Sequence, residues 1–202
     1  TARRMVIVVF VFGWFFSGWP QIPFTDFPSK VQEAEAAVTF TALTSGGRTD
    51  SPQTVYTTSS TAPSANKLIL LAVGRLGSGA VSSVSGNGLT WVQIADQFDG
   101  YGDGNLGVVL FRAMGASPVT GPITITFASA QQRANWSVVE FGNVDTSGTN
   151  GSGAIVQFAT SSNTGGTSIT ATLGAFASTS NATYGAANVG NNPVTAGTGF
   201  TL

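Results

Sequence analysis

The pattern of apolar and polar positions divides this chain of 202 residues into two unlike parts. Residues 5–19, MVIVVFVFGWFFSGW, form one continuous apolar run without a charged side chain. From residue 38 onward the chain is rich in Gly, Ser and Thr, and its apolar residues come in short segments that mostly alternate with polar ones. Alternation with a period of two is typical of β-strands. We therefore expect an apolar N-terminal segment followed by a β-rich domain.

Eleven short segments of the β-rich part have the pattern of strands, and clusters such as Ser-Gly-Gly and Gly-Asn-Gly separate them as turns. Many short strands separated by such turns predict an antiparallel β-sandwich. Segment 67–73 is almost continuously apolar, which predicts a central strand covered on both faces. The expected strands span residues 38–43, 54–58, 67–73, 81–84, 90–95, 107–113, 123–127, 134–141, 154–160, 168–173 and 183–188.

The apolar run is compatible with a signal peptide, a buried strand or a membrane span. A signal peptide needs small residues at its cleavage site, whereas this run ends in bulky aromatic residues. A buried strand fits the β-branched residues of segment 6–12. A membrane helix needs about 20 residues, which residues 4–24 supply when the interfacial positions are included. The pattern favours the span, so residues 1–20 are predicted to be one transmembrane helix.

The residues that flank the run predict its orientation in a membrane. Two arginines precede it and mark the cytoplasmic end under the positive-inside rule. Aromatic residues gather at the other end, where an interfacial belt is expected. The β-domain is then expected on the periplasmic or extracellular side of a bacterial membrane, with the N-terminus in the cytoplasm. The predicted membrane-interface residues are Arg3, Arg4, Trp14, Phe15, Phe16 and Trp19.

Residues 21–37 are predicted to connect the anchor to the β-domain, which would span residues 38–202. Prolines at positions 20, 23 and 28 exclude a regular helix or a central strand around them. Ser29 and Gln32 then have the spacing of a capping box, so we expect a short helix over residues 29–37. The connector should hold the β-domain away from the membrane.

Composition narrows the chemistry that the β-domain can perform. The net charge is −1 and no basic cluster follows Arg4, so nothing predicts nucleic-acid binding. The chain has no cysteine and no histidine, which removes disulfides, thiolate metal sites and Ser-His-Asp or Cys-His catalytic sites. We therefore predict that the protein is not an enzyme. Only 8% of its residues are charged, which favours a surface covered by protein partners.

The loop DQFDGYGDGN, residues 96–105, is the best candidate for a ligand site. Its carboxylate and amide oxygens are the ligands that calcium prefers, although their order is not that of an EF-hand. The alternative is a solvated hairpin loop, in which Asp-Gly pairs are common. The candidate calcium ligands are Asp96, Asp99, Asp103 and Asn105, and no other cofactor is expected.

Trp91, Trp136 and Glu140 lie on expected strands, and each could either be part of the core or contribute to a binding or catalytic site. Trp91 and Trp136 are more typical of a core than of a carbohydrate platform, but an exposed ring beside the acidic loop would favour sugar binding. Glu140 lies inside an apolar segment. Because buried charges are normally paired, we expect an ion pair between Glu140 and Arg112 or Arg133.

Two motifs, Gly-Leu-Thr-Trp (88–91) and Val-Val-Glu-Phe (138–141), stand out within a series of segments at residues 63–75, 81–97, 106–114, 119–128 and 135–145. Over residues 61–202 this series resembles a β-sandwich module of bacterial secreted and surface proteins and of phage tail proteins. The resemblance implies a jelly-roll-like adhesive or structural module without a known catalytic site. It also implies further strands after residues 199–201, so we expect the domain to be incomplete at its C-terminus, with one sheet position filled by the apolar connector or by a neighbouring subunit.

These features together predict a non-catalytic structural or accessory subunit. Anchored in the membrane, it would place a β-sandwich on the outer face to stabilise a larger membrane complex, for example an energy-converting or photosynthetic one. Its partners would be membrane lipid and other protein subunits. One alternative is a filament, surface-layer or virion protein whose apolar N-terminus packs into a neighbouring subunit. A second alternative is a tethered carbohydrate-binding or adhesive module.

Overall fold

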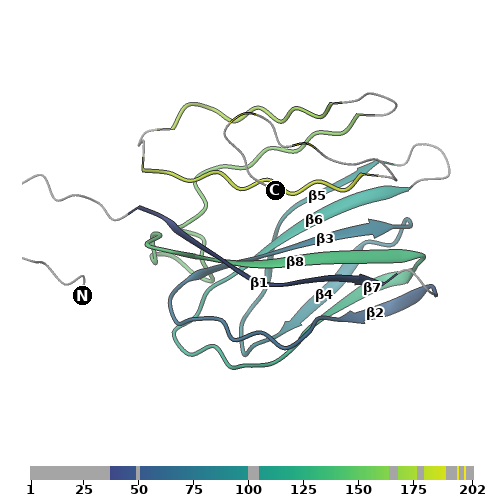
Figure 1. The fold of residues 1–202 in the computed structure, drawn as a ribbon, viewed down its shortest axis with the longest axis horizontal. Coiled ribbons are helices and arrows are strands. Elements are labelled where there is room, and N and C mark those ends of the chain that lie inside the picture. The colour runs from purple at the N-terminus through teal and green to yellow at the C-terminus, as the bar shows by residue number, and fades with distance from the viewer. Residues whose placement is uncertain are drawn as a thin grey trace, which may run out of the picture. The chain divides into compact units, whose positions relative to one another are not determined.

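The computed structural model describes residues 37–48, 51–99, 105–163, 168–176, 180–189, 195 and 198. These residues form eight β-strands and no helix (Figure 1). The prediction of an all-β fold with antiparallel sheets is confirmed for this part of the chain. The strands are β1 (Thr39–Arg48), β2 (Gln53–Thr57), β3 (Leu68–Leu76), β4 (Val81–Gly86), β5 (Val92–Asp99), β6 (Leu106–Ala113), β7 (Ile123–Gln131) and β8 (Arg133–Gly142).

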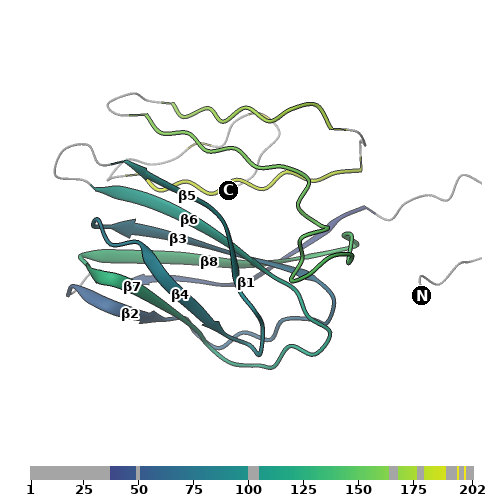
Figure 2. The same ribbon diagram turned by 180° about the vertical axis from the view of Figure 1, so that it is seen from behind.

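The strands are arranged in two antiparallel sheets (Figures 1 and 2). The larger sheet has the order β1-β8-β3-β6-β5, and the smaller has the order β2-β7-β4. Strand β3 is the centre of the larger sheet, and eight of its nine residues are buried. The apolar segment 67–73 is therefore a central strand covered on both faces, as its pattern predicts.

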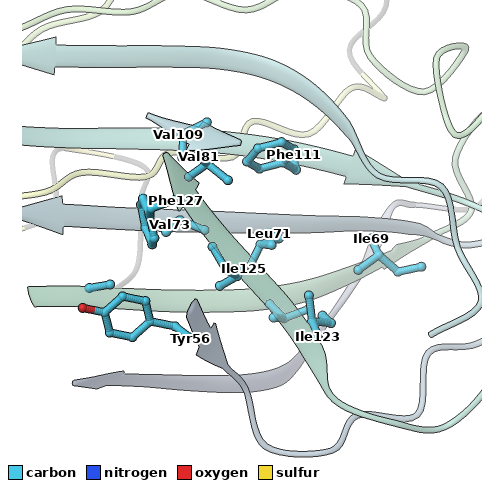
Figure 3. Packing of buried hydrophobic residues seen from close by; sticks show 12 residues of the cluster. Tyr56, Ile69, Leu71, Val73, Val81, Val109, Phe111, Ile123, Ile125 and Phe127 are labelled. Atoms are coloured by element: carbon cyan, nitrogen blue, oxygen red, sulfur yellow. The ribbon is translucent and has the colours of Figure 1, made fainter. Parts of the chain in front are cut away.

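The space between the two sheets is filled by aliphatic and aromatic side chains (Figure 3). Alternate residues of β3 point into this space, among them Ile69 and Leu71. Ile123 and Ile125 of β7 meet them from the smaller sheet, and all four side chains are fully buried. Tyr56 of β2 adds a ring whose hydroxyl donates to the backbone carbonyl of Gln131 at 2.9 Å. The sandwich core thus follows from the period-two pattern of the strands.

A second apolar cluster lies on the outer face of the larger sheet. It is formed by the alternate residues of β3 and β8 that point away from the sandwich interior, and residues that follow β8 in sequence cover it. This cover explains why β3 has no polar face. The cluster contains Leu68, Leu70, Val139 and Phe141, with Ile155 and Tyr184 packed against it.

Tyr184 shows how closely the covering segment packs. Its ring meets the ring of Phe141 edge-on, with centroids 5.9 Å apart. Burial raises the pKa of the Tyr184 hydroxyl, and a hydrogen bond with Ser137 offsets part of that effect. The segment around Tyr184 therefore contributes to the core of the domain.

The last three expected strands are not strands in the described part of the chain. Residues 155–163, 168–176 and 181–189 run extended (Figure 1) but form no strand pairs. A side chain replaces the ladder: the amide group of Gln157 donates to the carbonyl of Gly174 at 3.0 Å and accepts from its N–H at 2.9 Å. The strand predictions for segments 154–160, 168–173 and 183–188 are therefore wrong. Alternation of apolar and polar residues follows from burial of one face, whereas a ladder also requires a second strand whose backbone groups align with the first.

A buried asparagine ties the turns at one end of the sandwich together. Asn87 lies between β4 and β5, in the predicted Gly-Asn-Gly turn, and is 3% exposed. Its side-chain amide donates to the carbonyls of Val119 and Gly121, each at 3.0 Å. Asn87 and Gly88 both have positive φ, +55° and +64°, which Asn and Gly tolerate best. The turn therefore also fixes the loop between β6 and β7.

The predicted transmembrane helix of residues 1–20 lies outside the described residues, and so does the connector except for Ala37. In the part of the chain that the structure describes, no helix has the length and apolar character needed to cross a membrane.

Replacement of a core leucine tests the packing of the sandwich. Leu71 is fully buried between the sheets, so Leu71→Ala leaves a cavity and is expected to lower the free energy of unfolding by about 2–5 kcal/mol. Val119→Ala, at a residue that is 56% exposed, is the matched control and should cost less than about 0.5 kcal/mol. Urea denaturation followed by tryptophan fluorescence measures both. Equal losses in the two variants would contradict the described core.

Candidate functional site

The candidate calcium ligand Asp96 is engaged in an ion pair within the sandwich. Arg75 of β3 donates two hydrogen bonds to the Asp96 carboxylate, at 2.9 and 3.1 Å. Arg75 is only 3% exposed, and the two-pronged geometry uses both carboxylate oxygens. Asp96 therefore has a structural partner that a cation would have to displace.

The other predicted ligands flank the loop between β5 and β6. Asp99 ends β5, Asn105 immediately precedes β6, and Asp103 lies outside the described residues. The backbone carbonyl of Asn105 accepts a hydrogen bond from the N–H of Gly77 at 3.0 Å. Among the described residues, no group of three His, Cys, Asp or Glu side chains gathers closely enough to hold a metal ion. The calcium site stays a prediction.

Arg75 is the centre of a cluster that sequence reasoning missed. Its guanidinium lies 5.2 Å from the centre of the Phe98 ring, a cation–π contact. Gly107 leaves room for the guanidinium, because a Cβ atom there would come within 2.8 Å of Arg75 Nε. Asn188 donates to the backbone carbonyls of Arg75 and Gly107, at 3.0 and 2.9 Å. The cluster therefore attaches segment 180–189 to the sandwich. The one available sequence signal was an arginine in the apolar run of β3.

Both candidate tryptophans pack against the sandwich core. The indole N–H of Trp91 donates to the carbonyl of Gly86 at 3.3 Å. The ring of Trp136 lies 6.3 Å from the ring of Tyr56, and a Cβ atom on Gly46 would approach it to 3.0 Å. Each tryptophan is half-buried. This is the environment that the core interpretation expects, and a carbohydrate platform stays a prediction.

Glu140 is a buried carboxylate whose partners differ from the predicted ones. Its carboxylate accepts hydrogen bonds from the N–H of Ser64 at 2.5 Å, from the hydroxyl of Ser64 at 3.1 Å and from Lys67 Nζ at 3.0 Å. The prediction of an ion pair to Arg112 or Arg133 is wrong. Glu140 lies opposite Ile69 on β3, so the nearest base is the lysine two residues before Ile69. A basic residue at the start of a central strand was the available signal.

The electrostatics of Glu140 combine two opposing effects. Burial raises the pKa of its carboxyl group, because the charged form loses hydration. The hydrogen bonds from Ser64 and Lys67 stabilise the charged form and together outweigh burial, so the pKa of Glu140 lies below its usual value. The charged carboxylate therefore holds the segment before β3 against β8.

Two grooves lie between the larger sheet and the segments that follow β8. The first, of about 500 Å³, contains Arg112 of β6 beside Ile155 and Phe158. Arg112 Nε is buried and has no hydrogen-bond partner among the described residues. The second groove, of about 880 Å³, lies between residues 182–187 and the strands β1, β8 and β3, and no charged residue lines it.

Comparisons of the chain with protein-family models, with curated proteins and with solved structures find no match. The resemblance to a jelly-roll-like module therefore stays a prediction.

The Glu140 cluster predicts a dependence of stability on pH. A carboxylate whose pKa is lowered by folding stabilises the protein above the pKa of the unfolded chain, about 4.3 for Glu, and loses that contribution as the pH falls through the folded pKa. Glu140→Gln is therefore expected to lower the free energy of unfolding by about 1–3 kcal/mol at pH 7. The gap to the wild type should narrow below about pH 4. Denaturant titrations of both proteins, from pH 7 to below pH 4, measure this difference in the free energy of unfolding.

Lys67→Met serves as the comparison for Glu140→Gln. It removes one donor and leaves both Ser64 hydrogen bonds. It should therefore lower the free energy of unfolding by less than Glu140→Gln does at pH 7. A difference between wild type and Glu140→Gln that stays constant down to pH 3 would contradict the assigned role of the charged carboxylate.

Calcium titration tests the acidic loop. If Asp99, Asp103 and Asn105 bind calcium in the folded state, millimolar calcium should raise the melting temperature of the full chain. The response should disappear in Asp99→Asn/Asp103→Asn, and magnesium at equal concentration should have a smaller effect. An unchanged melting temperature in calcium would remove the metal site and leave a solvated hairpin loop.

Proposed function

We propose that this chain is a non-catalytic structural subunit anchored in a bacterial membrane by its apolar N-terminal segment. It holds a jelly-roll-like β-sandwich on the periplasmic or extracellular face and stabilises a larger assembly there, of which an energy-converting or photosynthetic complex is one example. Its partners are membrane lipid and other protein subunits. The observation that carries the proposal is an uncharged surface with exposed apolar side chains on the segments that follow β8.

This surface has the properties of a protein interface. Asp145 is the last charged residue of the chain, so residues 146–202 carry none. Within this stretch Val156, Phe158 and Ile169 are 64%, 59% and 48% exposed. Exposed apolar side chains on uncharged, extended segments favour the binding of another protein. A partner would bury them and supply backbone partners to segments that form no ladder of their own.

The use of the buried charged groups supports a structural role. Glu140 is held by Ser64 and Lys67, and Arg75 is held by Asp96. Each of these groups joins two parts of the fold. Catalytic acids and bases need access to a substrate, whereas these carboxylates bind groups of their own chain.

The strand order supports the jelly-roll form of the sandwich. Strands β1 and β8, β2 and β7, and β3 and β6 are neighbours, as in a long hairpin that is rolled over on itself. Strand β5 differs from the jelly-roll order: it pairs with β6 in the larger sheet and not with β4 in the smaller one. A filament, surface-layer or virion protein is the second candidate function. It is favoured by the ten-residue edge strand β1, which has no strand on its outer side among the described residues.

Fractionation of the full chain from bacterial membranes tests the proposal. The chain is expected to remain in the membrane pellet after carbonate washing and to run in a native gel, after mild detergent extraction, far above the size of its 20.6 kDa monomer. A chain that lacks residues 1–28 should leave the pellet. Val156→Ser/Phe158→Ser should keep the anchor but reduce the size of the particle.

Two outcomes would contradict the proposal separately. Release of the full chain by carbonate would remove the membrane anchor and favour the filament, surface-layer or virion alternative. A detergent-extracted chain that runs as a monomer would remove the structural role in an assembly.

A further inference from the structure

The four edge strands of the two sheets differ in how they are protected. Backbone groups at a sheet edge can pair with another chain, and natural proteins prevent this with charges, prolines, short strands or β-bulges. All four edge strands have a register shift, so the bulges do not distinguish them. Strand β5 carries Asp96 and Asp99. Strand β2 is five residues long and follows Pro52, and β4 is six residues long. Three of the four edges therefore carry a charge, a flanking proline or a short strand.

Strand β1 has a register shift between Ala42 and Thr44 but no charge, proline or shortness to protect most of its length. It is ten residues long, and residues 39–47 include neither a charge nor a proline. Its outer edge has no strand beside it among the described residues. Phe40 is 61% exposed, and the uncharged groove of about 880 Å³ borders the same strand. This edge has the length and the composition to accept another strand.

The side chains of β1 differ in size between its two halves. Pairing with β8 puts Phe40 opposite Phe141 and Ala42 opposite Val139, on the outer face of the sheet, because directly opposed residues share a face. The register shifts between Ala42 and Thr44, which brings Ser45 to the same face, opposite Ser137. The outer face of β1 is thus bulky at its start and small at its end.

Such a strand is complementary to a second copy of itself. In an antiparallel pair with a two-fold axis between Leu43 and Thr44, Ala42 lies opposite Ser45 of the second copy and Phe40 lies opposite Gly47. Each Phe40 ring then meets a position without a side chain. The register shift is essential, because adjacent residues of a regular strand point to opposite faces and could not be paired in this way. No charge would face its own copy across the axis.

We propose that β1 is the edge through which two copies of this chain associate, paired antiparallel about an axis between Leu43 and Thr44. The pairing joins two five-stranded sheets into one continuous sheet. This inference rests on the structural role proposed above and names a second copy of the chain as the partner at this edge.

Cysteine cross-linking tests the pairing and its register. The chain has no cysteine, so every introduced thiol is unique. Opposed residues of an antiparallel pair have Cα atoms about 4.5–5.5 Å apart, within the range that a disulfide spans. A mixture of full-length Ala42→Cys and Ser45→Cys chains should form the disulfide-linked dimer at least about tenfold faster than a mixture of Ala42→Cys and Ser83→Cys chains. Ser83 is exposed on β4, the edge of the smaller sheet.

A charge introduced on the edge of β1 gives a second test of the pairing. Ala42 is exposed, so Ala42→Lys should fold normally while two lysines near the axis repel each other. The detergent-extracted particle is expected to lose mass because its two copies of this chain separate, as measured by light scattering after size exclusion. Ser83→Lys adds the same charge on β4 and should leave the dimer intact.

The results separate this inference from the structural role on which it rests. Cross-linking no faster than the Ser83 control, or an unchanged mass in Ala42→Lys, would overturn pairing through β1. If such a chain still runs in a large native particle, the structural role stands and a different surface forms the contact. A wild-type chain that is monomeric throughout overturns both.

Discussion

Strand β3 must be covered on both faces, and the rest of the described structure depends on that constraint. Its inward residues pack against the smaller sheet, and its outward residues pack against the segments that follow β8. A two-layer sandwich would satisfy only the first face, since Leu68 and Leu70 would then meet water. At about 25 cal/mol for each Å² of apolar surface, their exposure would cost several kcal/mol. The described residues after residue 145 are therefore part of the fold, although they form no sheet.

Polar groups inside the sandwich connect elements that are distant in sequence. Glu140 fixes the entry to β3, Arg75 fixes the opposite end of the same strand, and Asn87 fixes the turns between strands. Each group joins at least two segments of the fold, which makes these contacts costly to lose. Four charged residues, Lys67, Glu140, Arg75 and Asp96, thus form ion pairs that hold the described part of the fold together.

The sequence predicts the fold better than it predicts the side-chain contacts, and particular residues show why. The eight described strands lie close to segments whose alternation predicts them, because burial on one face leaves a local pattern. Pairing does not leave such a pattern: Gln157 satisfies the backbone of Gly174 where alternation predicts a ladder. Likewise, the choice of Lys67 as partner of Glu140 depends on how β3 and β8 align. Of the candidate calcium ligands, Asp96 has an ion-pair partner that the local sequence does not reveal, since Arg75 is 21 positions away.

The way in which the C-terminal segments are attached has a consequence for the order of unfolding. They are held by a few side-chain hydrogen bonds and by apolar contacts, whereas the strands of the sandwich are held by continuous ladders. Segments with few cooperative bonds open at a lower free energy than the strands on which they lie. Local opening would uncover Val139 and its neighbours while both sheets stay intact. The domain thus contains an inner unit that survives and an outer layer that can exchange its contacts, a property that suits a component that meets its neighbours after it has folded.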